Sequence, residues 1–111
     1  MADANEVPEI TPTELSERLQ RKDDFDLIDV REPYELQIAA IPGARLIPLG
    51  QLEDSFDSLD KNREIVVMCR SGKRSATAVR QMIAAGFQHP NNLAGGILRW
   101  SRDVDPSVPT Y

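Results

Sequence analysis

Residues 69–75, with the sequence CRSGKRS, are the stretch around which the rest of the chain is organised. The preceding run, Glu64 to Met68, is apolar and rich in β-branched residues, as is typical of a buried strand. A helical pattern follows from Ala76 to Ala85, and Gly86 after it is a stop signal. The only cysteine of the chain is therefore predicted to lie at the carboxyl end of a strand, before a cationic loop and a helix.

This arrangement predicts an anion-binding loop with a reactive thiol. Ligand sites in parallel sheets lie beyond the carboxyl ends of the strands, and the amides of a loop or a helix N-terminus can hold an anion. We expect Cys69 to ionise more readily than a free thiol, because Arg70, Lys73 and Arg74 favour the thiolate. Gly72 permits a positive φ or the close approach of a ligand. An inert buried cysteine is the alternative, but such a residue does not need a cationic loop.

The composition is that of one globular domain. The chain has 111 residues, 41% hydrophobic and 28% charged, which suffices for one core and is too short for two. The net charge of −5 argues against nucleic acid as a partner. One cysteine can form no internal disulfide, and no apolar run is long enough to cross a membrane. Because Met1–Glu9 lacks a signal-peptide pattern, we expect a cytoplasmic protein.

Short strands alternate with helices along the chain, which favours an α/β fold with a mostly parallel sheet. A capping box of Thr11 and Glu14 marks the first helix, which we expect to run to about Arg21. The other expected strands are 25–30, 45–49 and 92–96, and the other expected helices begin at Pro33 and cover 51–59 and 97–102. We predict a flexible segment at 1–8, one domain at 9–104 and an irregular tail at 105–111.

Two further groups of residues have a structural and a functional interpretation. Asp29 and Arg31 lie at the end of the predicted strand 25–30. Arg31 either forms an ion pair with Asp29 or Glu32 that fixes the turn, or belongs with Asp29 to a shell of residues that supports the cysteine loop. The ion pair is the favoured interpretation. The single histidine, His89, lies in a predicted turn, where a solvated side chain is favoured over a general base. The glycines Gly95 and Gly96 form a tight turn or let the backbone pass close to the loop.

With these features in place, the chain resembles the rhodanese family of sulfurtransferases from about residue 10 to residue 102. The resemblance is carried by Leu27–Glu35, by Ile41–Ala44, and by residues 69–75 together with Leu93–Gly96 and Trp100. It implies a rhodanese-like fold, in which helices flank both faces of a central, mostly parallel, five-stranded sheet. It departs from many single-domain rhodaneses at Ala39-Ala40, where those proteins have Gly-His before the Ile-Pro-Gly-Ala turn.

The resemblance implies a two-step sulfur transfer. Cys69 would take a sulfane sulfur from thiosulfate or a protein persulfide, hold it as a persulfide and pass it to cyanide or a thiol. The cations Arg70, Lys73 and Arg74 would bind the anionic donor, and the loop amides from Arg70 to Ser75, including those of Ser71 and Gly72, would stabilise the persulfide. Asp29 and Arg31 would support the loop. No metal or organic cofactor is implied.

The spacing also separates this chain from related proteins. Cell-cycle phosphatases of the dual-specificity type have a loop that is one residue longer, so a phosphatase or arsenate reductase is disfavoured. Mercaptopyruvate sulfurtransferases typically have Gly-Ser after the cysteine, whereas Arg70-Ser71 is similar to the thiosulfate type. Residues 39–49 and 105–111 resemble the C-terminal domain of fused adenylyltransferase–sulfurtransferases. That resemblance implies a ubiquitin-like sulfur carrier protein and an adenylyltransferase domain as partners. A docking module without turnover is the other alternative.

Overall fold

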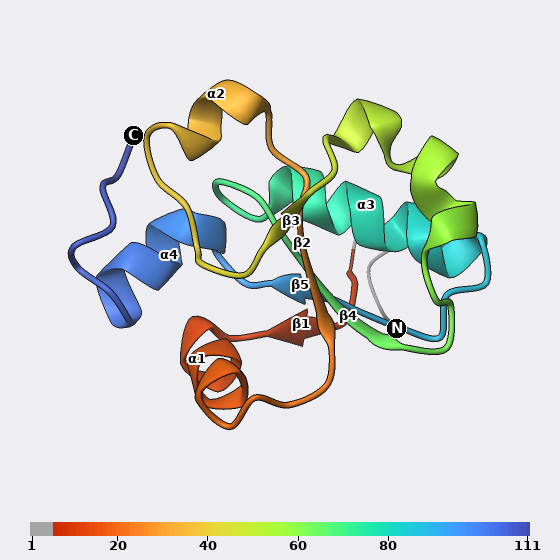
Figure 1. The fold of residues 1–111 in the computed structure, drawn as a ribbon, viewed down its shortest axis with the longest axis horizontal. Helices are drawn as coiled ribbons and strands as arrows, with labels where there is room; N and C mark the ends of the chain where they lie inside the picture. Colours follow the sequence, from red (N-terminus) through yellow and green to blue (C-terminus); the bar gives the residue numbers. More distant parts are fainter. Residues whose placement is uncertain (1–5) are drawn as a thin grey trace.

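The protein is described here by a computed structural model of residues 6–111, in which five strands form one parallel sheet (Figure 1). The strand order is β1-β5-β4-β2-β3, which confirms the predicted α/β class and makes the sheet parallel throughout. The strands are β1 (Glu9–Ile10), β2 (Asp26–Asp29), β3 (Arg45–Leu46), β4 (Glu64–Met68) and β5 (His89–Leu93).

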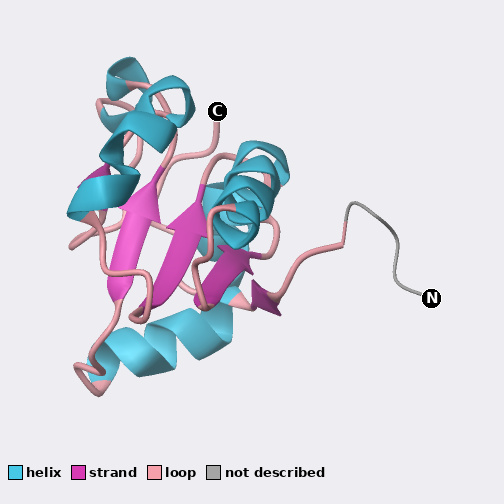
Figure 2. Cartoon of the chain, turned by 90° about the vertical axis from the view of Figure 1, so that its right-hand side faces the viewer, coloured by secondary structure: helices cyan, strands magenta, loops and turns pink. Residues whose placement is uncertain are grey.

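The helices bury two apolar clusters, one on each face of the sheet (Figure 2). They are α1 (Pro12–Gln20), α2 (Pro33–Leu36), α3 (Lys73–Ala84) and α4 (Gly96–Asp103), with 3-10 segments η1 (Leu49–Gln51) and η2 (Glu53–Ser58). Side chains of α3 and η2, such as Met82 and Phe56, pack with Val67 on one face. Leu15 of α1 and Trp100 of α4 pack with Val66 on the other. The alternation of Val66 and Val67 thus explains why β4 is buried on both sides.

Local sequence signals explain the first helix and the central strand. The Thr11 side chain accepts a hydrogen bond from the Glu14 amide at 3.1 Å, and the Glu14 carboxylate accepts one from the Thr11 amide at 3.1 Å. This is the predicted capping box, and α1 ends at Gln20, one residue before the predicted end. The predicted strand from Glu64 to Met68 has the same bounds as β4.

The helix predicted over residues 51–59 is present as 3-10 helix rather than α-helix. The segment consists of η1 and η2, although Leu52, Phe56 and Leu59 face inward as expected. Serine and aspartate are weak helix formers because their side chains compete for nearby backbone groups. The hydroxyl of Ser58 does so by donating a hydrogen bond to the Ser55 carbonyl at 2.8 Å.

The boundaries of β5 and α3 also differ from prediction. β5 begins at His89, where a turn was expected, and Pro90 is tolerated because β1 pairs with β5 only from Asn92 onward. The side of Pro90 that lacks an N–H therefore meets no strand. α3 begins at Lys73, inside the predicted loop. Gly72, with φ +100°, is its N-cap.

The register of the sheet brings three loops together at one edge. Asp29 of β2 lies opposite Met68 of β4, and Leu93 of β5 follows the residues paired with β4. The chain therefore continues into Arg31, Cys69 and Gly95 at the same carboxyl edge of the sheet. Of the predicted flexible segment 1–8, residues 1–5 lie outside the described part. No helix within residues 6–111 has the length and apolarity needed to cross a bilayer.

Candidate active site

Cys69 lies at the centre of this carboxyl edge, directly after the middle strand of the sheet. The residue is only 1% exposed, so its sulfur is enclosed by the loop. The Gly72 amide donates a hydrogen bond to Sγ at 3.0 Å, and the Ser75 amide donates one at 3.4 Å. The Ser75 hydroxyl lies 3.3 Å from the same sulfur. These contacts form a sulfur cradle, defined here as the Gly72 amide, the Ser75 amide and the Ser75 hydroxyl, and all three are suited to stabilise an anionic sulfur.

The start of α4 fixes the backbone of the loop from the opposite side. The Ile97 amide donates to the Cys69 carbonyl at 2.9 Å, and the Leu98 amide donates to the Arg70 carbonyl at 3.1 Å. A Cβ on Gly96 would lie 2.4 Å from the Arg70 carbonyl oxygen, and φ there is +61°. Only glycine fits this approach, which supports the expectation of a close backbone contact. Because the carbonyls of Cys69 and Arg70 accept hydrogen bonds from α4, they are directed away from the sulfur.

Asn92 of β5 holds the cradle in place and was missed in the sequence. Its side-chain amide donates to the Gly72 carbonyl at 3.1 Å, and its Oδ1 accepts a hydrogen bond from the Ser75 hydroxyl. The hydroxyl has one proton, which can go either to Asn92 or to the Cys69 sulfur. Asn92 is 3% exposed. No motif marks it, because the sequence predicts Asn92 only as the first residue of a short strand, after a turn that ends at Asn91.

Arg74 is ion-paired with a carboxylate that the sequence did not identify as part of the site. Its two terminal nitrogens donate to the two oxygens of Glu35, each at 2.8 Å. The Arg74 guanidinium is the main reason that the pKa of Glu35 falls from 4.5 to about 2, and Glu35 in turn raises the pKa of Arg74. The charge of Arg74, predicted to bind the donor, is therefore largely neutralised by Glu35.

Arg31 forms the predicted ion pair, and its partner is Asp29. The side chains are 0% and 1% exposed, and the closest nitrogen–oxygen distance is 2.7 Å. The Arg31 guanidinium also donates to the Ala39 carbonyl at 2.9 Å and to the Tyr111 hydroxyl at 2.7 Å. Ala39 thus holds Arg31 through its backbone carbonyl. This contact does not depend on the residue type at position 39, where the chain departs from many single-domain rhodaneses.

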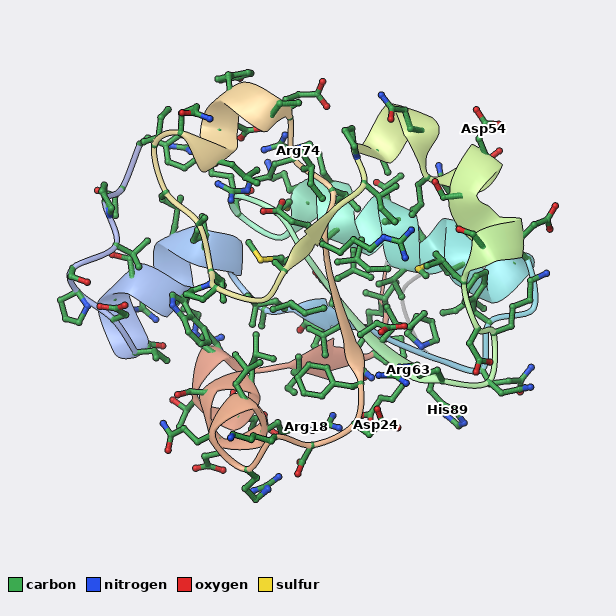
Figure 3. The ribbon with its side chains drawn as sticks, viewed as in Figure 1. Arg18, Asp24, Asp54, Arg63, Arg74 and His89 are labelled. Carbon is green, nitrogen blue, oxygen red and sulfur yellow. The ribbon has the colours of Figure 1, made fainter. Side chains whose placement is uncertain are left out.

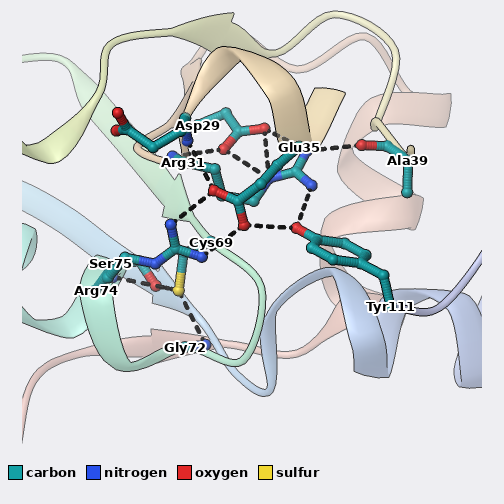
Figure 4. A network of polar contacts seen from close by, with 10 residues as sticks. Asp29, Arg31, Glu35, Ala39, Cys69, Gly72, Arg74, Ser75 and Tyr111 are labelled. Atoms are coloured by element: carbon teal, nitrogen blue, oxygen red, sulfur yellow. Dashed lines mark hydrogen bonds and ion pairs between the residues drawn. The ribbon is translucent and has the colours of Figure 1, made fainter. Parts of the chain in front are cut away.

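Tyr111 joins the two ion pairs (Figure 4). Its hydroxyl accepts the hydrogen bond from Arg31 and donates one to Glu35 at 2.9 Å. Burial is the main cause that raises the pKa of this phenol. The result is a continuous set of contacts that we call the arginine network. Its members are Asp29, Arg31, Glu35, Arg74 and Tyr111.

Two loop cations form no ion pair with an Asp or Glu side chain within residues 6–111. These are Arg70 and Lys73, and both are exposed. Ser71, between them, is exposed as well and lines a cleft of about 700 Å³ together with Gly72 and Lys73. The positive charge offered to an anion at this edge therefore comes from Arg70 and Lys73 rather than from Arg74.

His89 lies away from this edge of the sheet. It is the first residue of β5 (Figure 3) and pairs with Glu64, the first residue of β4, whereas Cys69 follows the last residue of β4. The side chain is exposed. The structure therefore agrees with the favoured interpretation of a solvated histidine.

Comparison with known proteins assigns the family. A model of the rhodanese-like domain matches residues 11–103. A protein of Allochromatium vinosum named sulfurtransferase is 36% identical over 92% of this chain and 95% of its own length. A Mycobacterium tuberculosis protein named probable adenylyltransferase/sulfurtransferase MoeZ is 38% identical over 92% of this chain, but only 26% of its own length is matched.

Solved structures agree with this match. A rhodanese-like domain protein of Staphylococcus aureus superposes with a TM-score of 0.80 at 30% identity, covering 95% of this chain and 99% of that one. The chain spans 40% and 53% of the length of two other curated relatives. The sequence match, the fold and the cysteine loop lead to the same conclusion: the chain belongs to the rhodanese-like domain family, whose members include sulfurtransferases.

Proposed function

We propose that the domain, over residues 9–104, is a sulfurtransferase of the thiosulfate type that carries sulfur as a persulfide on Cys69. The observation that supports this most is the sulfur cradle, where two amides and one hydroxyl converge on a single buried thiol. An inert core cysteine has no need of two backbone amides directed at its sulfur, with a hydroxyl beside them. The family match and the names of the relatives support sulfur transfer in general.

The first step is attack of the Cys69 thiolate on the outer sulfur of thiosulfate. A sulfur–sulfur bond forms, the bond between the two thiosulfate sulfurs breaks, and sulfite leaves with the electron pair. The Gly72 and Ser75 donors stabilise the negative charge on the sulfur. Arg70 and Lys73 attract the doubly charged donor to the mouth of the loop.

The second step regenerates the enzyme. A nucleophile such as cyanide attacks the outer sulfur of the persulfide and leaves as thiocyanate, while the electron pair returns to the Cys69 sulfur. A thiol acceptor would take the sulfur in the same way. The cradle donors serve both steps, because the charge stays on sulfur throughout.

The physiological acceptor we propose is a ubiquitin-like sulfur carrier protein activated by an adenylyltransferase. Support comes from the relative MoeZ, whose name joins adenylyltransferase and sulfurtransferase, and from the resemblance of residues 39–49 and 105–111 to such fused proteins. A protein persulfide would replace thiosulfate as donor in the cell. A free thiol at the site suits the reducing cytoplasm, where we place the reaction.

Steady-state formation of thiocyanate from thiosulfate and cyanide tests the proposal. We expect parallel double-reciprocal lines, because the two substrates react in separate steps through a covalent intermediate. Cys69→Ser should have no activity at any substrate concentration. Thiocyanate formation by Cys69→Ser, or none by the folded wild type with either thiosulfate or a protein persulfide, would contradict the proposal. The second outcome would favour a docking module.

A further inference from the structure

Tyr111 touches the loop cation that stands next to the cysteine. The guanidinium of Arg70 lies 5.1 Å from the centre of the Tyr111 ring, and it also donates a hydrogen bond to the main-chain oxygen of Tyr111. Arg70 is exposed, and a long exposed arginine ordinarily samples many rotamers. Two contacts to one residue restrict it to a single region beside the loop.

The position of Tyr111 is itself fixed from two directions. Its hydroxyl bridges Arg31 and Glu35, so the end of the ring is tied to the arginine network. Val108, three residues earlier, is 8% exposed in the apolar cluster beneath α4, and its carbonyl accepts a hydrogen bond from the Ser101 hydroxyl. The irregular segment 105–111 is thus anchored at two residues, Val108 and Tyr111.

Arg70 keeps donors for a ligand while it is held. A guanidinium has five N–H donors, and the Tyr111 main-chain oxygen takes one of them. The ring contact uses the face of the guanidinium rather than its donors. A held arginine loses less conformational freedom when an anion binds than a free one does, so the same charge binds the anion more tightly.

We propose that Tyr111 is a positioning residue that holds Arg70 for the binding of an anionic sulfur donor at Cys69. The inference concerns the same site and rests on the proposed function. It assigns to the irregular tail a role in donor binding, exerted through Arg70 rather than by contact with the sulfur.

The test compares two reagents that alkylate Cys69, the only cysteine of the chain. Iodoacetate is an anion, and iodoacetamide is its neutral counterpart with the same leaving group. Both must reach the same buried sulfur, so limited access affects both rates and cancels in their ratio. Each ratio is divided by the ratio measured for free cysteine. The proteins are wild type, Tyr111→Ala, Tyr111→Phe, Arg70→Ala, the double variant of Tyr111→Ala with Arg70→Ala, and Tyr34→Ala as the control for an exposed tyrosine.

We expect Tyr111→Ala and Arg70→Ala each to lower the preference for iodoacetate by about two- to fivefold, the range of a cation–π contact. The double variant should fall no further than Arg70→Ala alone, because Tyr111 acts through Arg70. Tyr111→Phe keeps the ring and should lose less than Tyr111→Ala. The iodoacetamide rate of the two Tyr111 single variants should stay within about twofold of wild type, since Tyr111 does not touch the sulfur.

Sulfur transfer provides the second measurement. Tyr111→Ala should raise the KM for thiosulfate by the same factor and change kcat by less than about twofold. A merely structural role would lower the folded fraction and would not divide the effect between KM and kcat in this way. Tyr34→Ala should match the wild type in both assays.

Three results would overturn the inference. They are a wild-type preference for iodoacetate no greater than that of free cysteine, an unchanged preference in Tyr111→Ala, and effects of Tyr111→Ala and Arg70→Ala that multiply. The alkylation ratio needs no persulfide chemistry. If the wild type forms no persulfide but the ratio responds as expected, the proposed function fails and the positioning role stands. The reverse result leaves the function intact and refutes the role of Tyr111.

Discussion

The sulfur cradle and the arginine network lie side by side at one edge of the sheet but are built from different materials. The cradle offers Cys69 two backbone amides and one hydroxyl. The network is made of charged side chains that neutralise one another, such as Asp29 with Arg31 and Glu35 with Arg74. The difference indicates that neutral dipoles stabilise the charge on the sulfur, while the charged groups hold the surrounding loops in place.

A physical reason underlies this division. Backbone amides are fixed by the fold and require no reorganisation when charge appears on the sulfur. Buried charges, in contrast, are costly unless each is paired, and removing one partner leaves the other without compensation. Changes in the network should therefore alter stability more than sulfur chemistry, and changes in the cradle should do the opposite.

The largest effect on stability is expected from Arg31→Leu. The variant leaves the buried carboxylate of Asp29 without its partner and should lower the free energy of unfolding by about 3–5 kcal/mol. Urea denaturation gives this value, and Arg45→Leu, at an exposed position on the neighbouring strand, is the matched control. The rate of persulfide formation by the folded fraction should remain within about threefold of wild type. A large loss of rate with unchanged stability would reverse the assignment of roles.

Gly96→Ala tests whether the cradle depends on the close approach of α4. The added methyl would lie 2.4 Å from the Arg70 carbonyl oxygen, so the loop backbone must shift. We expect a loss of about 2–4 kcal/mol in the free energy of unfolding, together with slower persulfide formation. Gly43→Ala has a φ of +89° but nothing within 4 Å and isolates the backbone strain. Equal losses in both variants would show that crowding at Gly96 has no effect.

Glu35→Gln makes the contribution of the second ion pair depend on pH. The pKa of Glu35 is about 2 in the folded protein, whereas a glutamate without these partners has a pKa of 4.5. Because the folded value is lower, this carboxylate stabilises the fold above about pH 4.5, and the contribution disappears as the pH falls through about 2. At pH 7 the variant should lose about 2–3 kcal/mol, and the loss should shrink on acidification. Glu53→Gln, at an exposed site, serves as the control for denaturation at each pH, and a loss independent of pH would argue against the ion pair.

The smallest expected effect is that of Ser75→Ala on the cradle. The variant removes the hydroxyl at 3.3 Å from the Cys69 sulfur and keeps the amide at 3.4 Å. Persulfide formation should slow about three- to tenfold, the range of one ordinary hydrogen bond, and the free energy of unfolding should fall by about 1 kcal/mol. Stopped-flow measurement of sulfite release reports the rate, with Ser16→Ala on α1 as control. An unchanged rate would remove the hydroxyl from the account of the cradle.

The fold and the cysteine loop could be predicted because their signals are local. The β-branched run of β4 and the capping box before α1 each lie within a few residues. The limits of β5 could not, because Pro90 and Asn91 are poor strand formers. They form a strand only because β4 is present to pair with them.

The partners in the arginine network were outside the reach of sequence reasoning for a similar reason. Glu35 and Arg74 are separated by 39 residues, and Tyr111 lies 76 residues beyond Glu35. Nothing in the pattern of either segment pairs these positions. The sheet register brings them together, so the cations beside Cys69 could be predicted from the sequence, whereas the neutralisation of Arg74 by Glu35 could not.

The intact mass of the reduced protein, measured before and after thiosulfate with Cys69→Ser in parallel, shows whether Cys69 carries the sulfur. We expect a gain of one sulfur atom in the wild type only, and the loss of that sulfur on addition of cyanide. A gain of sulfur by Cys69→Ser, or an unchanged mass of the wild type after both thiosulfate and a protein persulfide, would contradict this expectation.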